Sequence, residues 1–297
     1  MKSDDSRQDV RIRIIGAASG LGAQDQACED GPVAFHRSQV WHELAHHPRI
    51  DWGRTLFPPD EGAPAGRIAV LCRHLANEVE QTLNAGEFPV VIGGDHSIAI
   101  GTWSGVAAQL GEPPGLLWID AHLDSHTPET SYSGAIHGMP LACLLGRGDK
   151  RLLNIGRRGP QVSARHTAVL GPRSYEPEEI EFLQRMGVRI FFNDEIRQRG
   201  FAACLAEAIV LVSTASAGFG VTLDLDAIDP RMAPGVGSPE PDGLSAGEAR
   251  HALARLAALP GLRAFEIVEY NPDRDHWGIT AHLIRGLIEQ LLPSGAG

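Results

Sequence analysis

Short apolar runs recur along the chain, and longer stretches with a helical pattern separate them. Between residues 66 and 85 the apolar positions Ile68, Leu71, Leu75 and Val79 lie three or four residues apart, which predicts an amphipathic helix. The short runs have the length of buried strands. Those that we predict as strands are residues 12–15, 89–92, 116–119, 151–155, 188–192, 221–225 and 264–268.

A second helix is predicted over residues 245–259, because Ser245 opens it and Glu248 follows three residues later, the spacing of a capping box. Strands that alternate with helices predict an α/β fold, in which helices cover both faces of a mostly parallel sheet. No internal repeat or long linker interrupts the pattern. We therefore predict one domain over residues 11–297, preceded by a disordered tail at residues 1–10.

A glycine-rich segment follows the first predicted strand and carries Gly16, Gly20 and Gly22. It resembles the cofactor turn of short-chain dehydrogenases, which makes an NAD(P)-dependent oxidoreductase the rival hypothesis. Such a glycine pattern is weak evidence alone, and those enzymes also need a Tyr-x-x-x-Lys pair. The residues four positions after the three tyrosines are Ile136, Glu179 and Arg274. A plain glycine-rich loop is therefore favoured.

Composition and charge narrow the classes of partner. The chain has 297 residues, 43% of them hydrophobic, and a net charge of −11. It has no basic stripe, so nucleic acid is not expected as a partner. No apolar run approaches the roughly 18 residues of a membrane span, and no signal peptide is visible. The 4 cysteines are scattered, as in proteins of a reducing compartment. We expect a cytoplasmic protein.

Acids and histidines gather where the predicted strands end. Since ligands of open α/β sheets collect beyond the carboxyl ends of the strands, these residues are candidates for a common site. Acids at the end of a buried strand are costly unless something cationic compensates them. The residues concerned are Asp95, His96, Asp120, His122, Asp124, Asp224, Asp226, Asp229, Glu266 and Glu269.

Their spacing predicts that some of them converge. Asp120, His122 and Asp124 alternate, as do Asp224 and Asp226, and alternate residues of an extended chain face the same way. A lone Asp-x-Asp is more often a turn, and a lone histidine is more often a packed structural residue. Together they form a mixed nitrogen and oxygen set that suits Mn²⁺ among divalent metals. A two-metal site would lower the pKa of a bound water.

Four peptides carry a resemblance to a known family. GGDHS, DAHLD, SYSGAIHGMP and TLDLDAIDPRMAPGVGSPEPDGLS closely resemble signatures of the arginase, agmatinase and formimidoglutamase (ureohydrolase) family. The resemblance runs from about residue 12 to residue 292, and the metal motifs are highly specific in combination. It implies a three-layer α/β/α fold around an eight-stranded, mostly parallel sheet, assembled as trimers or hexamers.

The resemblance also implies roles for individual residues. One manganese would be held by His96, Asp120, Asp124 and Asp224. The other would be held by His122, Asp120, Asp224 and Asp226. A hydroxide that bridges both metals would attack the guanidinium carbon and release urea. Ni²⁺ and Co²⁺ remain alternatives to manganese.

Three further roles follow from the same resemblance. Glu269 matches the glutamate that holds the substrate guanidinium. His137 matches a histidine at the mouth of the active site that acts in proton transfer. Asp124 would pass the proton of the nucleophile to the leaving amine.

The chain departs from the family pattern at the residues that would bind the amino-acid end of the substrate. The spacing from Asp124 to His137 is typical of the arginase branch, in which an Asn, a Ser and a second Asn receive the α-carboxylate. The corresponding residues are His126, Ser133 and Ala135, so only the serine is kept. Glu176 and Glu179 take the places of the acids that face the amino group.

The substrate itself stays open between several candidates. L-Arginine is the best single prediction, and another guanidino acid, agmatine, guanidinobutyrate and a formimino compound are the alternatives. The stretch 157–173 is rich in Gly, Pro and Arg, which is typical of a surface excursion. We expect its part 157–171 to cover the mouth of the site.

Overall fold

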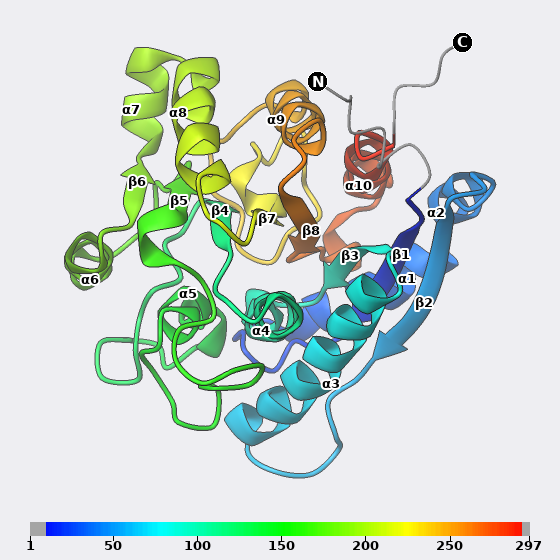
Figure 1. The fold of residues 1–297 in the computed structure, drawn as a ribbon. Coiled ribbons are helices and arrows are strands. Elements are labelled where there is room, and N and C mark those ends of the chain that lie inside the picture. Colours follow the sequence, from blue (N-terminus) through cyan, green and yellow to red (C-terminus); the bar gives the residue numbers. More distant parts are fainter. Residues whose placement is uncertain (1–9, 293–297) are drawn as a thin grey trace.

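The computed structural model describes residues 10–292 and is built on one eight-stranded sheet (Figure 1). The strands are β1 (Ile12–Ala17), β2 (Ile50–Leu56), β3 (Phe88–Gly93), β4 (Gly115–Ile119), β5 (Thr167–Leu170), β6 (Arg189–Phe191), β7 (Phe219–Asp224) and β8 (Leu262–Val268). Their order in the sheet is β2-β1-β3-β8-β7-β4-β5-β6. Every pairing between neighbouring strands is parallel, so the carboxyl ends of all strands meet at one edge.

Helices cover both faces of this sheet, as Figure 1 shows. One face carries α1 (Gly31–Arg37), α2 (Gln39–Leu44), α7 (Asn193–Arg199), α8 (Phe201–Ser213), α9 (Ala246–Ala257) and α10 (Ile279–Glu289). The other carries α3 (Pro64–Asn84), α4 (Ala99–Leu110), α5 (Pro140–Leu144) and α6 (Pro177–Met186). Short 3₁₀ helices join them at η1 (Gln26–Asp30), η2 (His96–Ile98), η3 (Ile136–Gly138), η4 (Ala164–His166), η5 (Leu225–Ala227) and η6 (Pro272–Arg274).

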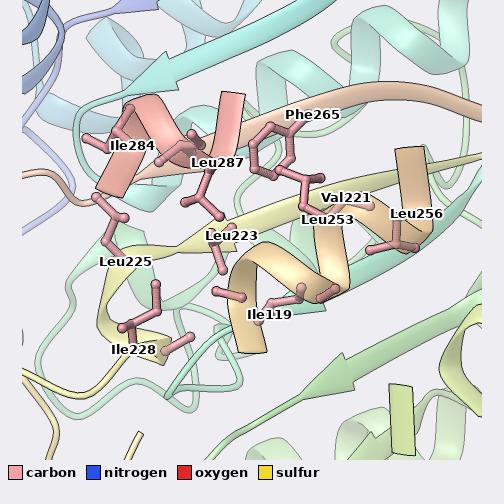
Figure 2. Packing of buried hydrophobic residues seen from close by; sticks show 14 of the residues in the cluster. Ile119, Val221, Leu223, Leu225, Ile228, Leu253, Leu256, Phe265, Ile284 and Leu287 are labelled. Atoms are coloured by element: carbon pink, nitrogen blue, oxygen red, sulfur yellow. The ribbon is translucent and has the colours of Figure 1, made fainter. Parts of the chain in front are cut away.

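The core divides into two layers because successive side chains of a strand point to opposite faces. On β1, Ile14 packs into the cluster under α8 to α10, whereas Ile15 packs into the cluster under α3 and α4. Figure 2 shows the first of these layers, in which Val221 of β7 and Phe265 of β8 lie against Leu253 of α9. A parallel sheet buried on both faces explains why the strands read as continuous apolar runs. The expected three-layer α/β/α architecture is confirmed.

Six of the seven predicted strands lie on observed strands, and the run 151–155 does not. That segment forms turns. Its Leu152 is buried in a loop, so the apolar pattern there marks a packed loop. The sheet instead takes β5 from within the stretch 157–173, which was wrongly expected to be a surface excursion. β2 was missed because it is an edge strand in which only one of seven residues is buried.

Both predicted helices are present as α3 and α9. The capping box of α9 is formed, since the Ser245 amide donates to Glu248 over 2.8 Å and the Glu248 amide donates to Ser245 Oγ over 3.1 Å. Nine of the ten residues of the predicted tail lie outside the described residues. No helix among residues 10–292 combines the length and the apolar character that crossing a bilayer requires.

Candidate functional site

The candidate ligands come from four neighbouring strands at the centre of the sheet. β3, β8, β7 and β4 are adjacent in that order, and their carboxyl ends lead into His96, Glu269, Asp224 and Asp120 respectively. A histidine or an acid at the end of each strand is thus delivered to the same edge, where ligands of open α/β sheets bind. The sheet topology therefore brings together residues that are far apart in the sequence.

His96 stands at the centre of a ring of carboxylates. Its Nδ1 lies 3.1 Å from Asp120 Oδ2, 3.0 Å from Asp124 Oδ2 and 3.2 Å from Asp224 Oδ2. The atom is buried, yet none of these oxygens meets the geometry of a hydrogen bond. A buried polar atom without a partner is costly. A cation among these groups would satisfy the nitrogen and the carboxylates together.

The other ring nitrogen of His96 fixes which atom can bind a metal. His96 Nε2 lies 3.0 Å from Thr222 Oγ1, and that hydroxyl donates to Glu266 Oε1 over 2.7 Å. Because the hydroxyl donates to the carboxylate, it accepts from Nε2–H, which leaves the lone pair on Nδ1. The ring also stacks on Trp118 with centroids 4.2 Å apart. Histidine ligands of metals are commonly held in this way.

A second group shares one carboxylate with the first. His122 Nδ1 lies 3.0 Å from Asp226 Oδ2 and 3.5 Å from Asp120 Oδ1. Asp120 therefore faces His96 with one oxygen and His122 with the other. In each group, candidate ligand atoms lie within 4.8 Å of one another, which is close enough to surround one ion. The groups are His96, Asp120 and Asp124, and Asp120, His122 and Asp226.

The protein does not fully compensate the negative charges of the clustered carboxylates. Burial and the charge of Asp120 raise the pKa of Asp124 to about 6. Burial and the charges of Asp226 and Asp120 raise the pKa of Asp224 well above its usual range. Buried carboxylates in contact hold protons because they cannot all be ionised. A divalent cation would take the place of these protons, so the residues fit a divalent metal ion.

The backbone that presents these groups is not the extended chain assumed from the alternation. β4 ends at Ile119, and Asp124 has a positive φ of 48°. Asp226 lies in η5 rather than on the strand. The residues do converge, but turns after the strands aim them. Glu269 also has a positive φ, 65°, an uncommon conformation for a residue with this side chain and one that recurs at functional sites.

The buried Glu269 and the partly exposed His137 form a pair beside the carboxylates. His137 Nδ1 lies 3.0 Å from Glu269 Oε1, which also accepts the His96 amide over 3.0 Å. The second carboxylate oxygen accepts from Cys28 Sγ over 3.2 Å. Burial alone lowers the pKa of His137, but its hydrogen bond to Glu269 outweighs this and raises the pKa to about 9. At neutral pH the imidazole is therefore protonated in this structure.

The residues predicted to contact the amino-acid end of the substrate lie together at the mouth of the pocket. His126 Nε2 lies 2.9 Å from Glu176 Oε2, and its Nδ1 lies 3.1 Å from Thr130 Oγ1. Glu179 accepts the Ser125 amide over 3.0 Å and the Glu176 amide over 3.1 Å. The loop after β4 is thereby bound to the first turn of α6. Both nitrogens of His126 and both oxygens of Glu179 already contact protein groups.

A single cavity of about 270 Å³ is lined both by candidate metal ligands and by the residues around His126. No lining residue comes from the segment 157–171, so the expectation that this segment covers the mouth is wrong for the described residues. The lining consists of His122, Asp124, His126, Ser131, Tyr132, Ser133, His137, Gly138, Ser174, Glu176, Glu179, Asp224, Asp226, Ser238 and Glu269.

Two strand-end acids from the sequence do not join the cluster. Asp95 accepts the Ser97 amide over 2.9 Å and the Gly22 amide over 3.0 Å, so it holds the glycine-rich loop. That loop packs so closely that a Cβ on Gly94 would lie 2.0 Å from the Ser19 carbonyl oxygen. Asp229 pairs with Arg231 over 2.7 Å. Both are structural, and the glycine pattern is a packing feature.

Sequence reasoning also missed Thr222 and Cys28, which hold side chains of the site in place. Thr222 had a usable signal, because it stands two residues before Asp224 on β7 and pairs with Glu266 of β8 in the sheet. Cys28 had none. It reaches Glu269 from a part of the chain 241 residues away, and a single cysteine carries no spacing pattern.

Comparisons with known proteins agree with this geometry. The profile described as the Arginase family matches residues 10–293. An arginase from Brevibacillus brevis is 43% identical, over 94% of this chain and 97% of its own length. The crystal structure of an arginase from Bacillus cereus superposes with a TM-score of 0.88 at 34% identity, covering 97% of this chain and 100% of that one.

A more distant relative was solved with a bound ligand. The Entamoeba histolytica arginase in complex with L-ornithine has a TM-score of 0.87 and 25% identity, covering 96% of this chain and 99% of that one. The fold described above is thus similar to the folds of solved arginases from distant organisms.

Proposed function

This chain belongs to the arginase family, hydrolases that act on guanidino C–N bonds, and from that premise we propose that it is a binuclear manganese enzyme releasing urea from L-arginine. The observation that carries the proposal is the pair of groups that share Asp120, with the unpartnered His96 Nδ1 at their centre. An NAD(P) oxidoreductase is excluded by the family.

The proposed ligands divide into the two sets that the sequence predicts. His96, Asp120, Asp124 and Asp224 would hold one ion, and His122, Asp120, Asp224 and Asp226 the other. A set of carboxylates with imidazoles suits Mn²⁺, and Ni²⁺ or Co²⁺ would also accept it. When bound, the two ions would lower the pKa of a water so that it can attack near neutral pH.

The residues beside the ligands would orient the substrate and move protons. Glu269 is a buried carboxylate at the bottom of the cavity, and a guanidinium pairs well with a carboxylate because both are planar and can form two parallel hydrogen bonds. Asp124 would carry the proton of the attacking water to the leaving amine. His137 lies partly exposed beside Glu269 and would relay a further proton between the site and bulk water.

Two observations support L-arginine as the substrate. The related Entamoeba histolytica protein was crystallised with L-ornithine, the amine that remains when urea leaves L-arginine. Glu176 lines the mouth and offers a carboxylate to an α-ammonium group. Ser133 is proposed to contact the α-carboxylate together with His126, and Glu179 fixes Glu176 and Ser125 from behind.

Agmatine is a second candidate, favoured by one observation. Both nitrogens of His126 contact protein groups, and Ala135 has no side-chain donor, so an α-carboxylate finds few free partners. Urea release from L-arginine, agmatine, guanidinobutyrate and a formimino compound, measured with added Mn²⁺, tests the proposal. Absence of urea from every guanidino compound would reject it.

The assembly is also a proposal. From the family we propose a homotrimer or homohexamer, and light scattering at micromolar concentration tests it. A monomer would contradict it.

A further inference from the structure

Cys28 contacts the carboxylate that is proposed to bind the guanidinium. Its Sγ lies 3.2 Å from Glu269 Oε2, and its side chain is completely buried. The cysteine belongs to η1, in the connection after β1, whereas Glu269 follows β8. The contact therefore joins the connection after β1 to the segment after β8, whose Glu269 lines the cavity.

The direction of this hydrogen bond is set by chemistry. An ionised carboxylate can only accept, so the thiol is the donor. Burial, and then the charge of Glu269, raise the pKa of the Cys28 thiol far above its usual range, so the proton stays on sulfur. The other oxygen, Oε1, receives the His96 amide and His137 Nδ1. Among residues 10–292, Cys28 is the hydrogen-bond donor to Oε2.

The surrounding backbone leaves the pair no room to turn away. A Cβ on Gly237 would lie 2.7 Å from Glu269 Oε2 and 3.0 Å from Cys28 Sγ. A Cβ on Gly31, just after η1, would lie 2.4 Å from the Tyr270 carbonyl oxygen. The segment that carries Cys28 is thus packed against the segment that carries Glu269. An uncommon positive φ, such as that of Glu269, persists only where neighbouring groups hold it.

We propose that Cys28 is a positioning residue for guanidinium recognition, because its thiol fixes the Oε2 oxygen of Glu269. With Oε1 held by His96 and His137, and Oε2 held by Cys28, the carboxylate plane has one orientation. That orientation presents both oxygens to a planar guanidinium. The inference rests on the proposed role of Glu269, and it adds a residue outside the metal sets and outside the mouth.

The test compares two substitutions that differ by one donor. Cys28→Ala removes the thiol, and we expect kcat/KM for the best guanidino substrate to fall about tenfold, mostly through KM. Cys28→Ser supplies a hydroxyl donor and should restore most of the loss. Cys204→Ala is the matched control, since Cys204 is also fully buried but lies in α8. Melting temperature and bound metal are measured for each variant.

A second variant disturbs Glu269 without changing the thiol. Gly237→Ala places a methyl group against Oε2 and should raise KM in the same way while Cys28 stays intact. This variant keeps the inference testable if Cys28→Ala does not fold.

Three outcomes decide between this inference and its premise. If Cys28→Ala has the same kcat/KM as Cys204→Ala, the positioning role is wrong. If Cys28→Ser is as impaired as Cys28→Ala, although it supplies a donor, a hydrogen bond to Oε2 is not what the substrate needs and the positioning role is wrong. If Glu269→Gln keeps full activity, the premise fails, whatever the cysteine variants show.

Discussion

The cavity has two regions that are built in different ways. We call the candidate metal ligands and Glu269 the floor, and the residues around His126, Ser133 and Glu176 the mouth. On the floor, His96 and Asp120 follow directly on β3 and β4 and are completely buried. At the mouth, Ser133 lies in an exposed loop, and His126 and Glu176 hold a loop against a helix end through their side chains. A change on the floor leaves a buried charge without its partner, which is costly. A change at the mouth alters a contact near solvent.

Under the proposed function, this difference assigns the reaction to the floor and the selectivity to the mouth. The sheet fixes the positions of the floor residues. The mouth depends on individual side chains, and it is the mouth that carries the departures His126 and Ala135. We therefore expect floor substitutions to affect every substrate and mouth substitutions to discriminate between substrates.

The largest effect is expected for the floor residue Asp226. Asp226→Ala removes a carboxylate from the second group, so the protein should lose mainly one of two divalent metals, which we expect to lie about 3.5 Å apart. We expect kcat to fall by at least about a hundredfold. Elemental analysis and urea release measure the two quantities. A wild-type protein that binds one metal or none when fully loaded would contradict the two-metal proposal.

A smaller but still large effect is expected for Glu269, which lies on the floor without being a proposed ligand. Glu269→Gln keeps the shape and removes the charge, so both metals should remain while kcat/KM falls about a hundredfold. Asp224→Asn is the comparison, because it should lose metal. Equal metal loss in the two variants would place Glu269 in the metal shell.

The contacts on the floor could be predicted from the sequence better than those at the mouth, for physical reasons. A buried strand is a recognisable apolar run, and an acid at its end is visible because apolar residues precede it. Asp120 and Asp224 were found in this way. The backbone that aims Asp124 and Asp226 was not predicted, because turns after a strand depend on what they pack against. β2 and β5 were lost since one is exposed and the other lies within a loop-like composition.

At the mouth, the sequence predicted which residues belong to the site but not which of them contact one another. His126 and Glu176 stand 50 residues apart, and only the placement of α6 beside the loop after β4 brings them together. Cys28 was missed for the same reason. Contacts between separate loops leave no periodic trace, so they become visible only in three dimensions.

A moderate effect is expected for His126, and it should depend on the substrate. If His126 contacts a substrate carboxylate, His126→Ala should lower kcat/KM about tenfold for guanidino acids and spare agmatine, which has no carboxylate. Tyr132→Phe is the control, since Tyr132 donates to Glu178 over 3.0 Å and links the same loop to α6. Equal losses on both classes of substrate would show that His126 supports the loop.

The smallest effect concerns stability and comes from Glu179 behind the mouth. Burial raises the pKa of Glu179 to about 7, although the amides of Ser125 and Glu176 oppose the shift. The pKa of an exposed glutamate is about 4.3, so between these values the folded state holds a proton that the unfolded state has released. The contribution to stability is therefore fully present below about pH 4.3 and is lost as the pH rises through about 7.

Glu179→Gln isolates this contribution, because glutamine does not titrate. Metal-free wild type and variant are unfolded with urea between pH 5 and 8, with chelator present so that metal binding to the floor does not enter. The wild type should lose roughly 1–3 kcal/mol relative to the variant as the pH rises across this range. Asp124 also titrates near pH 6, but it is present in both proteins, so its effect largely cancels in the difference. Parallel stability curves would mean that Glu179 is ionised in the folded protein, with the backbone amides outweighing its burial. The mouth would then carry a fixed negative charge facing the substrate ammonium at all of these pH values.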